Sequence, residues 1–268
     1  MLSVPTVQVF HENLSQLCHE LHDKLRTSEH PAVDQKVELA VKALEELLLA
    51  QRFTPAQEKT LLKIDTISQH VPLTQEAYAY YEKDVAKTIA QGIIEQRDQS
   101  LILSHSNVKR KYYQAVKEAH FTNMKAHTNV LAIGNGPLPI SPIVYATKTG
   151  ARITIVETEA RDQNEAVQTI TAMGLSKKIN FIGTQQINTH AKKADIVLLS
   201  GSITNKRKIL EELVNVVNPG TVMLCRTATG LRSLLREHVS LARLPEYTKI
   251  GMIHPSKNGI ESTAVLLR

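Results

Sequence analysis

Cysteine is scarce in this chain of 268 residues, which contains Cys18 and Cys225. Two cysteines cannot build a disulfide framework, so we expect a reduced, cytoplasmic setting. Glycine and proline are too few for a collagen-like or low-complexity chain. The first residues, MLSVPTVQVFHENL, lack the charged region and apolar run that characterise a signal peptide.

Long apolar runs are also absent, and no stretch approaches the roughly 20 residues of a membrane-spanning helix. Aromatic residues make up 4% of the chain, which argues against a base-stacking platform for nucleic acid. The net charge of +6 is uneven: residues 1–128 hold 15 basic and 16 acidic residues, and residues 129–268 hold 17 and 10. The basic residues form separate, loop-like clusters such as Lys206-Arg207-Lys208. We therefore expect a negatively charged small ligand, and neither nucleic acid nor a membrane as partner.

Histidine is frequent, with 11 residues, but its spacing does not predict a metal site. His19 and His22 stand three residues apart in a helical pattern, and no third ligand is placed near them by spacing. A structural metal site needs three or four ligands at defined positions. We expect the protein to bind no metal.

The first part of the chain has apolar residues at helical spacings of three and four. Helices are predicted over about 14–25 and 37–49, from Thr54-Pro55 onward, from near Thr74 to Arg97, and over about 107–125. Proline suits the first turn of a helix, which supports the start at Thr54-Pro55. Residues 1–126 are therefore predicted to form an all-helical domain. If Glu82 and Tyr112 of this domain act on the ligand, the domain must close over the ligand as a lid.

After Asn129 the pattern changes to short apolar runs that alternate with helical stretches near 140–148, 160–173 and 205–217. Such alternation predicts βαβ units and a parallel sheet. A Pro-Ser-Lys-Asn-Gly loop joins the last two runs, which should pair antiparallel. The layout resembles that of S-adenosylmethionine-dependent methyltransferases, so we expect an α/β, Rossmann-like class I methyltransferase-type domain over 127–268. Its seven predicted strands are Val130–Ile133, Arg152–Val156, Ile179–Ile182, Ile196–Leu199, Val222–Cys225, Lys249–Ile253 and Thr263–Leu267.

A glycine motif, Gly134-Asn135-Gly136-Pro137-Leu138-Pro139, follows the first predicted strand. Glycines at this point let the backbone approach a bound nucleotide. Glu157 ends the second strand 21 residues after Gly136, where a carboxylate can bind ribose hydroxyls. The alternative is a tight turn with a solvated glutamate. The prolines make the helix end a poor pyrophosphate cradle, because they lack N–H groups, which favours S-adenosylmethionine over NAD.

Polar residues also follow the third and fourth strands, where ligands bind in open α/β sheets. Gln185 and Ser200-Gly201 could hold the adenine and the methionine part, or they could form ordinary turns. The residues expected to bind S-adenosylmethionine are Gly134, Asn135, Gly136, Pro137, Leu138, Glu157, Thr158, Gln185, Ser200 and Gly201.

The segment from Gly134 to Ala146, GNGPLPISPIVYA, resembles the GSGPLPLTSIVLA stretch of the nicotianamine synthase family. It is the most specific part of a resemblance that covers about residues 76–268. Further segments match in order: Tyr112-Tyr113-Gln114 resembles NYLKL, Glu157-Thr158-Glu159 stands for Asp-Ile-Asp, Met223–Gly230 resembles LMLRSAHG, Ile253-His254-Pro255 resembles Tyr-His-Pro, and Glu261–Val265 resembles NSVV.

The resemblance implies transfer of the 3-amino-3-carboxypropyl group of S-adenosylmethionine to an amine, with release of 5′-methylthioadenosine. In the bacterial branch that makes opine metallophores, the acceptor is the α-amino group of histidine, and an opine dehydrogenase acts on the product. Metal is then bound by the product. The alternatives are a nicotianamine synthase with repeated transfers, a methyltransferase, and a non-catalytic nucleotide- or RNA-binding module suggested by the basic half.

Glu82 is the predicted general base that removes a proton from the amine. It shares a helical face with Ala79, Ala86 and Ile89, and a carboxylate in an apolar face needs a partner or a function. The structural alternative is an ion pair with a lysine of the next helix, such as Lys109 or Lys111. The resemblance assigns Tyr112 to catalysis and substrate binding, and the adjacent Tyr113 is its rival.

Arg226 and His254 are the remaining predicted substrate-binding residues. A guanidinium at a strand end can bind a carboxylate through two hydrogen bonds. His254 could add a polar contact or simply cap its strand. The apolar stripe from Leu44 to Leu49 is expected to be exposed, which would allow a homodimer.

Overall fold

The computed structural model describes residues 4–28, 34–50, 53–241, 244–255 and 259–268. The chain divides into two compact units. The first comprises Met1–Val85 and Ala228–His238, and the second comprises Ala86–Thr227 and Val239–Arg268. The expected boundary after residue 126 marks the change from helices to strands. As a domain boundary it stays a prediction.

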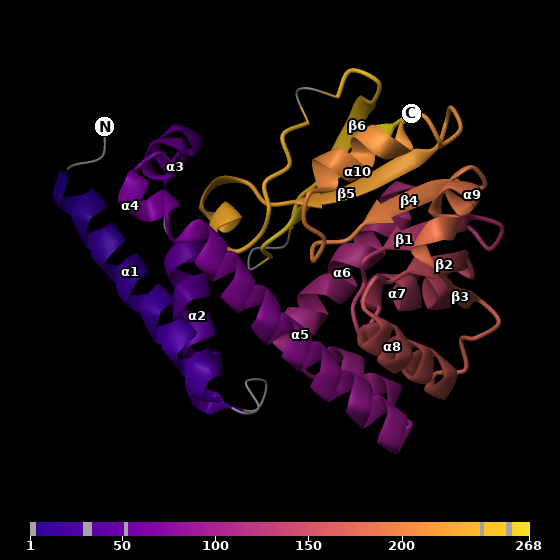
Figure 1. Cartoon of the computed structure of the whole chain (residues 1–268), viewed down its shortest axis with the longest axis horizontal. Helices are drawn as coiled ribbons and strands as arrows, with labels where there is room; N and C mark the ends of the chain where they lie inside the picture. Colours follow the sequence, from indigo (N-terminus) through magenta and orange to yellow (C-terminus); the bar gives the residue numbers. More distant parts are fainter. Residues whose placement is uncertain (1–3, 29–33, 51–52, 242–243, 256–258) are drawn as a thin grey trace. The chain divides into compact units, whose positions relative to one another are not determined.

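The first unit is helical (Figure 1, indigo to purple, with a short orange segment). Its elements are α1 (Val4–Thr27), α2 (Gln35–Ala50), α3 (Pro55–Leu61), α4 (Asp65–Ser68), the first part of α5 (Val71–Gln96) and the 3-10 helix η3 (Gly230–Leu234). The predicted start of α3 is confirmed, because Thr54 and Gln57 form a capping box. The N–H of Thr54 donates to the Gln57 side chain at 2.8 Å.

The apolar faces of these helices form the core of the first unit. Leu14 and Leu21 of α1 and Leu44 of α2 are completely buried. The stripe from Leu44 to Leu49 is therefore not the exposed surface that was expected, since Leu48 is buried as well. It gives no support to a homodimer.

The second unit contains the rest of α5, the 3-10 helix η1 (Gln99–Leu103), α6 (Ser106–Phe121) and the strands. Its other elements are β1 (Asn129–Ile133), α7 (Ile140–Thr149), β2 (Arg152–Val156), α8 (Ala160–Ala172), β3 (Ile179–Ile182), η2 (Thr184–Gln186), α9 (Ile187–Ala191), β4 (Ile196–Leu199), α10 (Lys206–Leu213), β5 (Val222–Thr227), β6 (Thr248–Ile253) and β7 (Ser262–Leu267).

Two helices end earlier than expected. The chain leaves α6 at Phe121, and Asn123 takes a left-handed conformation with φ of +51°. Asparagine tolerates this conformation, which ends a helix. In the same way α10 ends at Leu213, and turns lead to Pro219, which cannot continue a helix.

All seven predicted strands form one sheet, in the order β3-β2-β1-β4-β5-β7-β6 (Figure 1). The pairs from β3 to β5 are parallel, and β7 runs antiparallel to both β5 and β6. This confirms the Rossmann-like class I methyltransferase type and the final antiparallel pair. Residues 256–258 of the loop that joins β6 to β7 lie outside the described residues.

The strand order reverses between β1 and β4, which lie side by side. One face of the sheet is packed by a core cluster that joins Leu131 and Ile133 of β1 to Leu210 and Leu213 of α10. Because side chains alternate along a strand, neighbouring residues of β1 face the opposite side. The carboxyl ends of β1 and β4 lie at this reversal point, which is where ligands bind in open α/β sheets. None of the described helices is long and apolar enough to cross a membrane.

Candidate functional site

The glycine motif forms a tight loop at the carboxyl end of β1. Gly134 and Gly136 have φ values of +64° and +65°, a conformation that favours glycine. Glu157, at the end of β2, accepts hydrogen bonds through Oε2 from the N–H groups of Asn135, at 3.0 Å, and Gly136, at 2.8 Å. The carboxylate predicted to bind ribose thus also holds the loop in shape.

The other oxygen of Glu157 binds its own turn. Oε1 accepts a hydrogen bond from the N–H of Thr158 at 2.9 Å. Glu157 is half-buried and Thr158 is exposed. The structure therefore differs from a glutamate that is merely solvated, and ribose binding by Glu157 and Thr158 stays a prediction.

The prolines of the motif stand where α7 begins. Pro137 and Leu138 are buried, and α7 starts at Ile140, directly after Pro139. The carbonyl of Pro139 accepts the first intrahelical hydrogen bond, from the N–H of Ile143 at 3.0 Å. The expectation that the helix starts in spite of the prolines is confirmed.

The end of β4 lies against the glycine loop. Ser202 donates a hydrogen bond to the carbonyl of Gly134 at 3.4 Å, and its Oγ lies 2.9 Å from Oγ of the buried Ser200. A side chain at Gly134 would collide with Ile203. Ser200 and the glycine loop are thus close together at the reversal point of the sheet. Gln185 is exposed on η2, after β3.

Gly201 is enclosed by two charged side chains that the sequence did not single out for the site. Its carbonyl accepts a hydrogen bond from Nζ of Lys206 at 3.3 Å, and the carboxylate of Glu261 lies against its Cα. Lys206 was expected in a loop-like basic cluster, but it begins α10 and is completely buried. The reason is local: Asn205 has φ of +58° and turns the chain so that α10 begins with Lys206 pointing inward.

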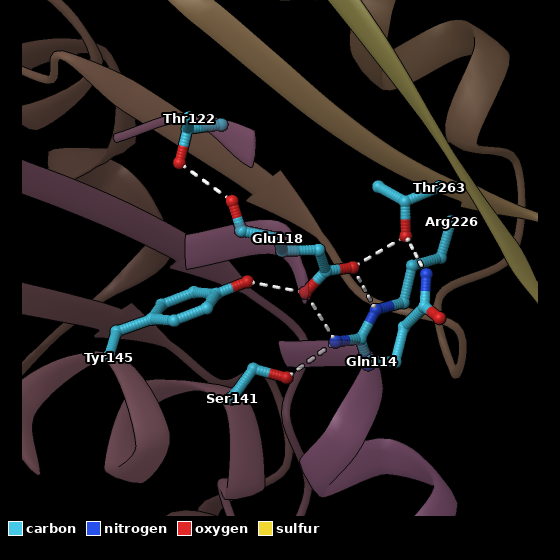
Figure 2. A network of polar contacts seen from close by, with 7 residues as sticks. All are labelled: Gln114, Glu118, Thr122, Ser141, Tyr145, Arg226 and Thr263. Carbon is cyan, nitrogen blue, oxygen red and sulfur yellow. Dashed lines mark hydrogen bonds and ion pairs between the residues drawn. The ribbon is translucent and has the colours of Figure 1, made fainter. Parts of the chain in front are cut away.

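Arg226 lies at the centre of a buried polar network (Figure 2). Its guanidinium donates to both carboxylate oxygens of Glu118, through Nε at 2.9 Å and Nη2 at 2.8 Å. Nη2 also donates to Ser141 of α7 at 2.7 Å. Glu118 further accepts hydrogen bonds from Tyr145 at 2.6 Å and from Thr263 of β7 at 2.5 Å. The bidentate partner of Arg226 in this structure is Glu118, and binding of a substrate carboxylate by Arg226 stays a prediction.

The charges of this network are mutually stabilised. Burial opposes the charge of Arg226, but the Glu118 carboxylate outweighs it and raises the pKa of the guanidinium above its usual value. Burial, together with the charge of Glu118, raises the pKa of the Tyr145 hydroxyl well above its ordinary value. Glu118 was missed in the sequence. The signal that could have found it is the one used for Glu82, a carboxylate beside buried helix positions such as Ala115 and Ala119.

Glu82 belongs to the first unit and is buried, with 6% of its surface exposed. Its Oε2 forms an ion pair with Nη2 of Arg236, which is also buried. The Arg236 guanidinium stacks over the ring of Tyr78 at 5.2 Å, and the Tyr78 hydroxyl donates to Glu45 at 2.7 Å. The structure thus pairs Glu82 with Arg236, whereas the structural alternative was a lysine of the following helix. Arg236 could not be connected to Glu82 by hydropathy or spacing, because the two residues lie far apart in the chain.

Tyr112 and Tyr113 lie on α6, in the second unit. Tyr112 is half-buried and Tyr113 is 47% exposed, and their rings meet edge to face with centroids 5.6 Å apart. His254 is exposed after β6, and its carbonyl accepts a hydrogen bond from Lys117 at 3.2 Å. The catalytic or binding roles of Tyr112 and His254 stay predictions. Across the described part of the chain, no group of three or more His, Cys, Asp and Glu side chains is placed to hold a metal ion.

Comparison with curated proteins finds relatives of low identity. L-Histidine 2-aminobutanoyltransferase of Yersinia pestis is 26% identical over 118 residues, which is 44% of this chain and 44% of that protein. Nicotianamine synthase 2 of Arabidopsis thaliana is 25% identical over 199 residues, 66% of this chain and 62% of that protein. The chain thus spans less than two thirds of the length of these relatives.

Comparison with solved structures supports the fold over the whole chain. The structure of MtNAS in complex with MTA and tNA has a TM-score of 0.86 at 19% identity, covering 100% of this chain and 99% of that one. A glutamate-to-glutamine mutant of MtNAS in complex with S-adenosylmethionine has a TM-score of 0.84 at 20% identity, covering 97% and 98%.

A family model described as nicotianamine synthase protein matches residues 105–268. The match runs from the start of α6 through the glycine loop, Glu157 and Arg226 to the last strand, and it covers more than half of the chain. The chain belongs to the nicotianamine synthase family.

Proposed function

We propose that this protein transfers the 3-amino-3-carboxypropyl group of S-adenosylmethionine to the α-amino group of an amino acid and releases 5′-methylthioadenosine. The observation that carries the proposal is the glycine loop held by Glu157 at the reversal point of the sheet, within the segment that matches the family. The MtNAS mutant of the same fold was solved in complex with S-adenosylmethionine, which supports the choice of ligand.

The reaction is a displacement at carbon. The acceptor nitrogen attacks Cγ of the methionyl arm, the N–Cγ bond forms and the Cγ–S bond breaks. Its electron pair goes to the sulfonium sulfur, which becomes the neutral thioether of 5′-methylthioadenosine. The acceptor must first lose a proton, because an ammonium has no electron pair with which to attack. No oxidant or metal is needed for this balance.

Glu82 is the proposed base. A carboxylate buried among apolar residues of α5 is held in one position by Arg236, and a fixed base is what proton abstraction needs. Tyr112 is proposed to orient the transferred group. The glycine loop, Glu157, Thr158 and the end of β4 at Ser200 and Gly201 are proposed to bind the adenosyl ligand, with Gln185 at its adenine. His254 and Arg226 remain proposed substrate contacts.

Histidine is the proposed acceptor, which the name of the Yersinia relative supports. A single transfer is proposed, so the product would pass to an opine dehydrogenase in the cytoplasm. Repeated transfer to give nicotianamine is the second candidate, favoured by the similarity to the Arabidopsis synthase.

Mass spectrometry after incubation with S-adenosylmethionine and L- or D-histidine tests the proposal. We expect 5′-methylthioadenosine and one aminocarboxypropyl adduct of histidine. Formation of S-adenosylhomocysteine would identify a methyltransferase and refute the transfer, and an azetidine-containing product would identify the nicotianamine reaction. Salt-dependent RNA binding without turnover would support a non-catalytic module.

Replacing the base tests the assignment of Glu82. Glu82→Gln preserves the shape of the side chain but cannot accept a proton, so we expect transfer to slow by at least about 100-fold. The affinity for S-adenosylmethionine, measured by calorimetry, should change less than about threefold, because the base acts on the acceptor. Glu76→Gln, at an exposed position on the same helix, is the control and should keep full activity. An active Glu82→Gln enzyme would remove Glu82 from the mechanism.

A further inference from the structure

Glu261 places a carboxylate at the ligand-binding edge of the sheet. It directly precedes β7, whose first residue, Ser262, pairs with Thr227 at the carboxyl end of β5. The Glu261 carboxylate lies against Cα of Gly201, at the carboxyl end of β4, where any larger residue would collide with it. Its Oε1 atom is buried. Glu261 therefore lies on the opposite side of the glycine loop from Glu157.

A cation accompanies this carboxylate. Lys111 of α6 interacts electrostatically with Glu261, and Gln114 and Glu118 of the same helix contact β7 or β5 through Thr263 and Arg226. Residues 111, 114 and 118 lie at helical spacing, so one face of α6 points at this edge of the sheet. Burial lowers the pKa of Lys111 to about 8; Arg226 and Arg110 also lower it, while Glu261 raises it. The ammonium form of Lys111 still predominates at pH 7.

Two opposite charges that are taken out of water are costly, because their desolvation commonly costs more than their attraction returns. The head group of an α-amino acid carries an ammonium and a carboxylate next to each other, with the polarity opposite to that of Glu261 and Lys111. Such a head group can add a hydrogen-bonded partner to each charge.

We propose that Glu261 and Lys111 form a subsite for the head group of an α-amino acid, in which Glu261 binds the ammonium and Lys111 binds the carboxylate. The inference rests on the proposed function, because both the methionyl arm of S-adenosylmethionine and the acceptor carry this head group. The subsite lies on the β4 side of the glycine loop, whereas Glu157, the proposed ribose partner, lies on the β2 side. The head group and the ribose would therefore bind on opposite sides of the loop.

The test compares two ligands that differ in the head group. S-Adenosylmethionine carries it and 5′-methylthioadenosine does not. Calorimetry gives the dissociation constants of both for the whole protein and for Glu261→Gln, which keeps the size of the side chain, and steady-state kinetics gives KM for the acceptor. Lys111→Met is the second variant, and Glu246→Gln, at an exposed position, is the control.

If the subsite holds the methionyl arm, Glu261→Gln weakens S-adenosylmethionine binding about tenfold or more and leaves 5′-methylthioadenosine within about twofold. If it holds the acceptor, KM for the acceptor rises about tenfold or more and both dissociation constants stay the same. Either result supports the proposal when Lys111→Met changes the same constant. Changes within twofold in all three constants, or equal weakening of both nucleosides, would overturn it. A wild-type protein that binds neither nucleoside would refute the proposed function and the subsite together.

Discussion

At the scale of the residue, two buried carboxylates, Glu82 and Glu118, have similar surroundings. Each is buried on a helix among apolar neighbours, and each pairs with an arginine distant in the chain, Arg236 or Arg226. The sequence pointed to Glu82 because of its apolar face, and the same criterion applied to α6 would have found Glu118. Glu118 also accepts hydrogen bonds from Tyr145 and Thr263, which supports a structural role for this carboxylate.

Removing Glu118 should destabilise the second unit strongly. Glu118→Ala leaves the buried Arg226 without its bidentate partner and Tyr145 and Thr263 without their acceptor, so we expect a loss of about 3–5 kcal/mol in the free energy of unfolding. Urea unfolding followed by circular dichroism measures the change. Glu246→Ala, at the surface, should stay within about 0.5 kcal/mol of the wild type.

A double-mutant cycle that combines Glu118→Ala with Arg226→Met measures the coupling energy between Glu118 and Arg226. The combined variant should lose clearly less stability than the sum of the single losses, because no buried charge is left alone. Additive losses would contradict a direct coupling between Glu118 and Arg226.

At the scale of the element, the loop after β1 is defined by backbone geometry and by close packing. Gly134 and Gly136 both have positive φ, but only Gly134 faces a neighbour, the side chain of Ile203 after β4. The space around Gly136 is open within 4 Å of a Cβ atom. A substitution at Gly136 would therefore cause conformational strain alone, whereas a substitution at Gly134 would add a steric collision.

Alanine substitutions at the two glycines should have unequal effects. Gly136→Ala is expected to cost about 1–2 kcal/mol in unfolding free energy, the strain of a left-handed alanine. Gly134→Ala should cost more and weaken S-adenosylmethionine binding at least about tenfold, because the ends of β1 and β4 must move apart. Adding Ile203→Ala should restore part of both losses. Equal effects of the two glycine variants, measured by thermal unfolding and calorimetry, would contradict the close packing.

At the scale of the whole molecule, the chain leaves the sheet after β5 and returns for β6, and the first part of the segment between them, Ala228–His238, belongs to the helical unit. Residues 228–238 include η3, which packs against α2 and α3, and Arg236, the partner of Glu82. The helical unit is therefore not built from the first half of the chain alone, because residues 228–238 of the second half belong to it. Arg236 of this segment forms the ion pair with Glu82, the proposed base.

Breaking the Glu82–Arg236 pair should loosen the first unit selectively. Arg236→Met leaves the Glu82 carboxylate buried without this cation, and we expect faster amide hydrogen exchange in α2, α5 and residues 228–238. Exchange in the strands β1 to β5 should be unchanged. Combining Arg236→Met with Glu82→Gln should restore slow exchange in part, whereas equal acceleration throughout the chain would contradict a local role of the pair.

The sequence alone determined the elements and the ligand loop of this protein. The seven strands, the helices between them and the glycine loop followed from apolar periodicity and from glycine and proline, which act over a few residues. Only the tertiary structure decided which charges meet: Arg236 with Glu82, and Arg226 with Glu118. An ion pair acts over a few ångströms in space but over any distance in the chain, so local pattern does not encode it. For this reason the strands and their final antiparallel pair were predictable, and the partners of the buried charges were not.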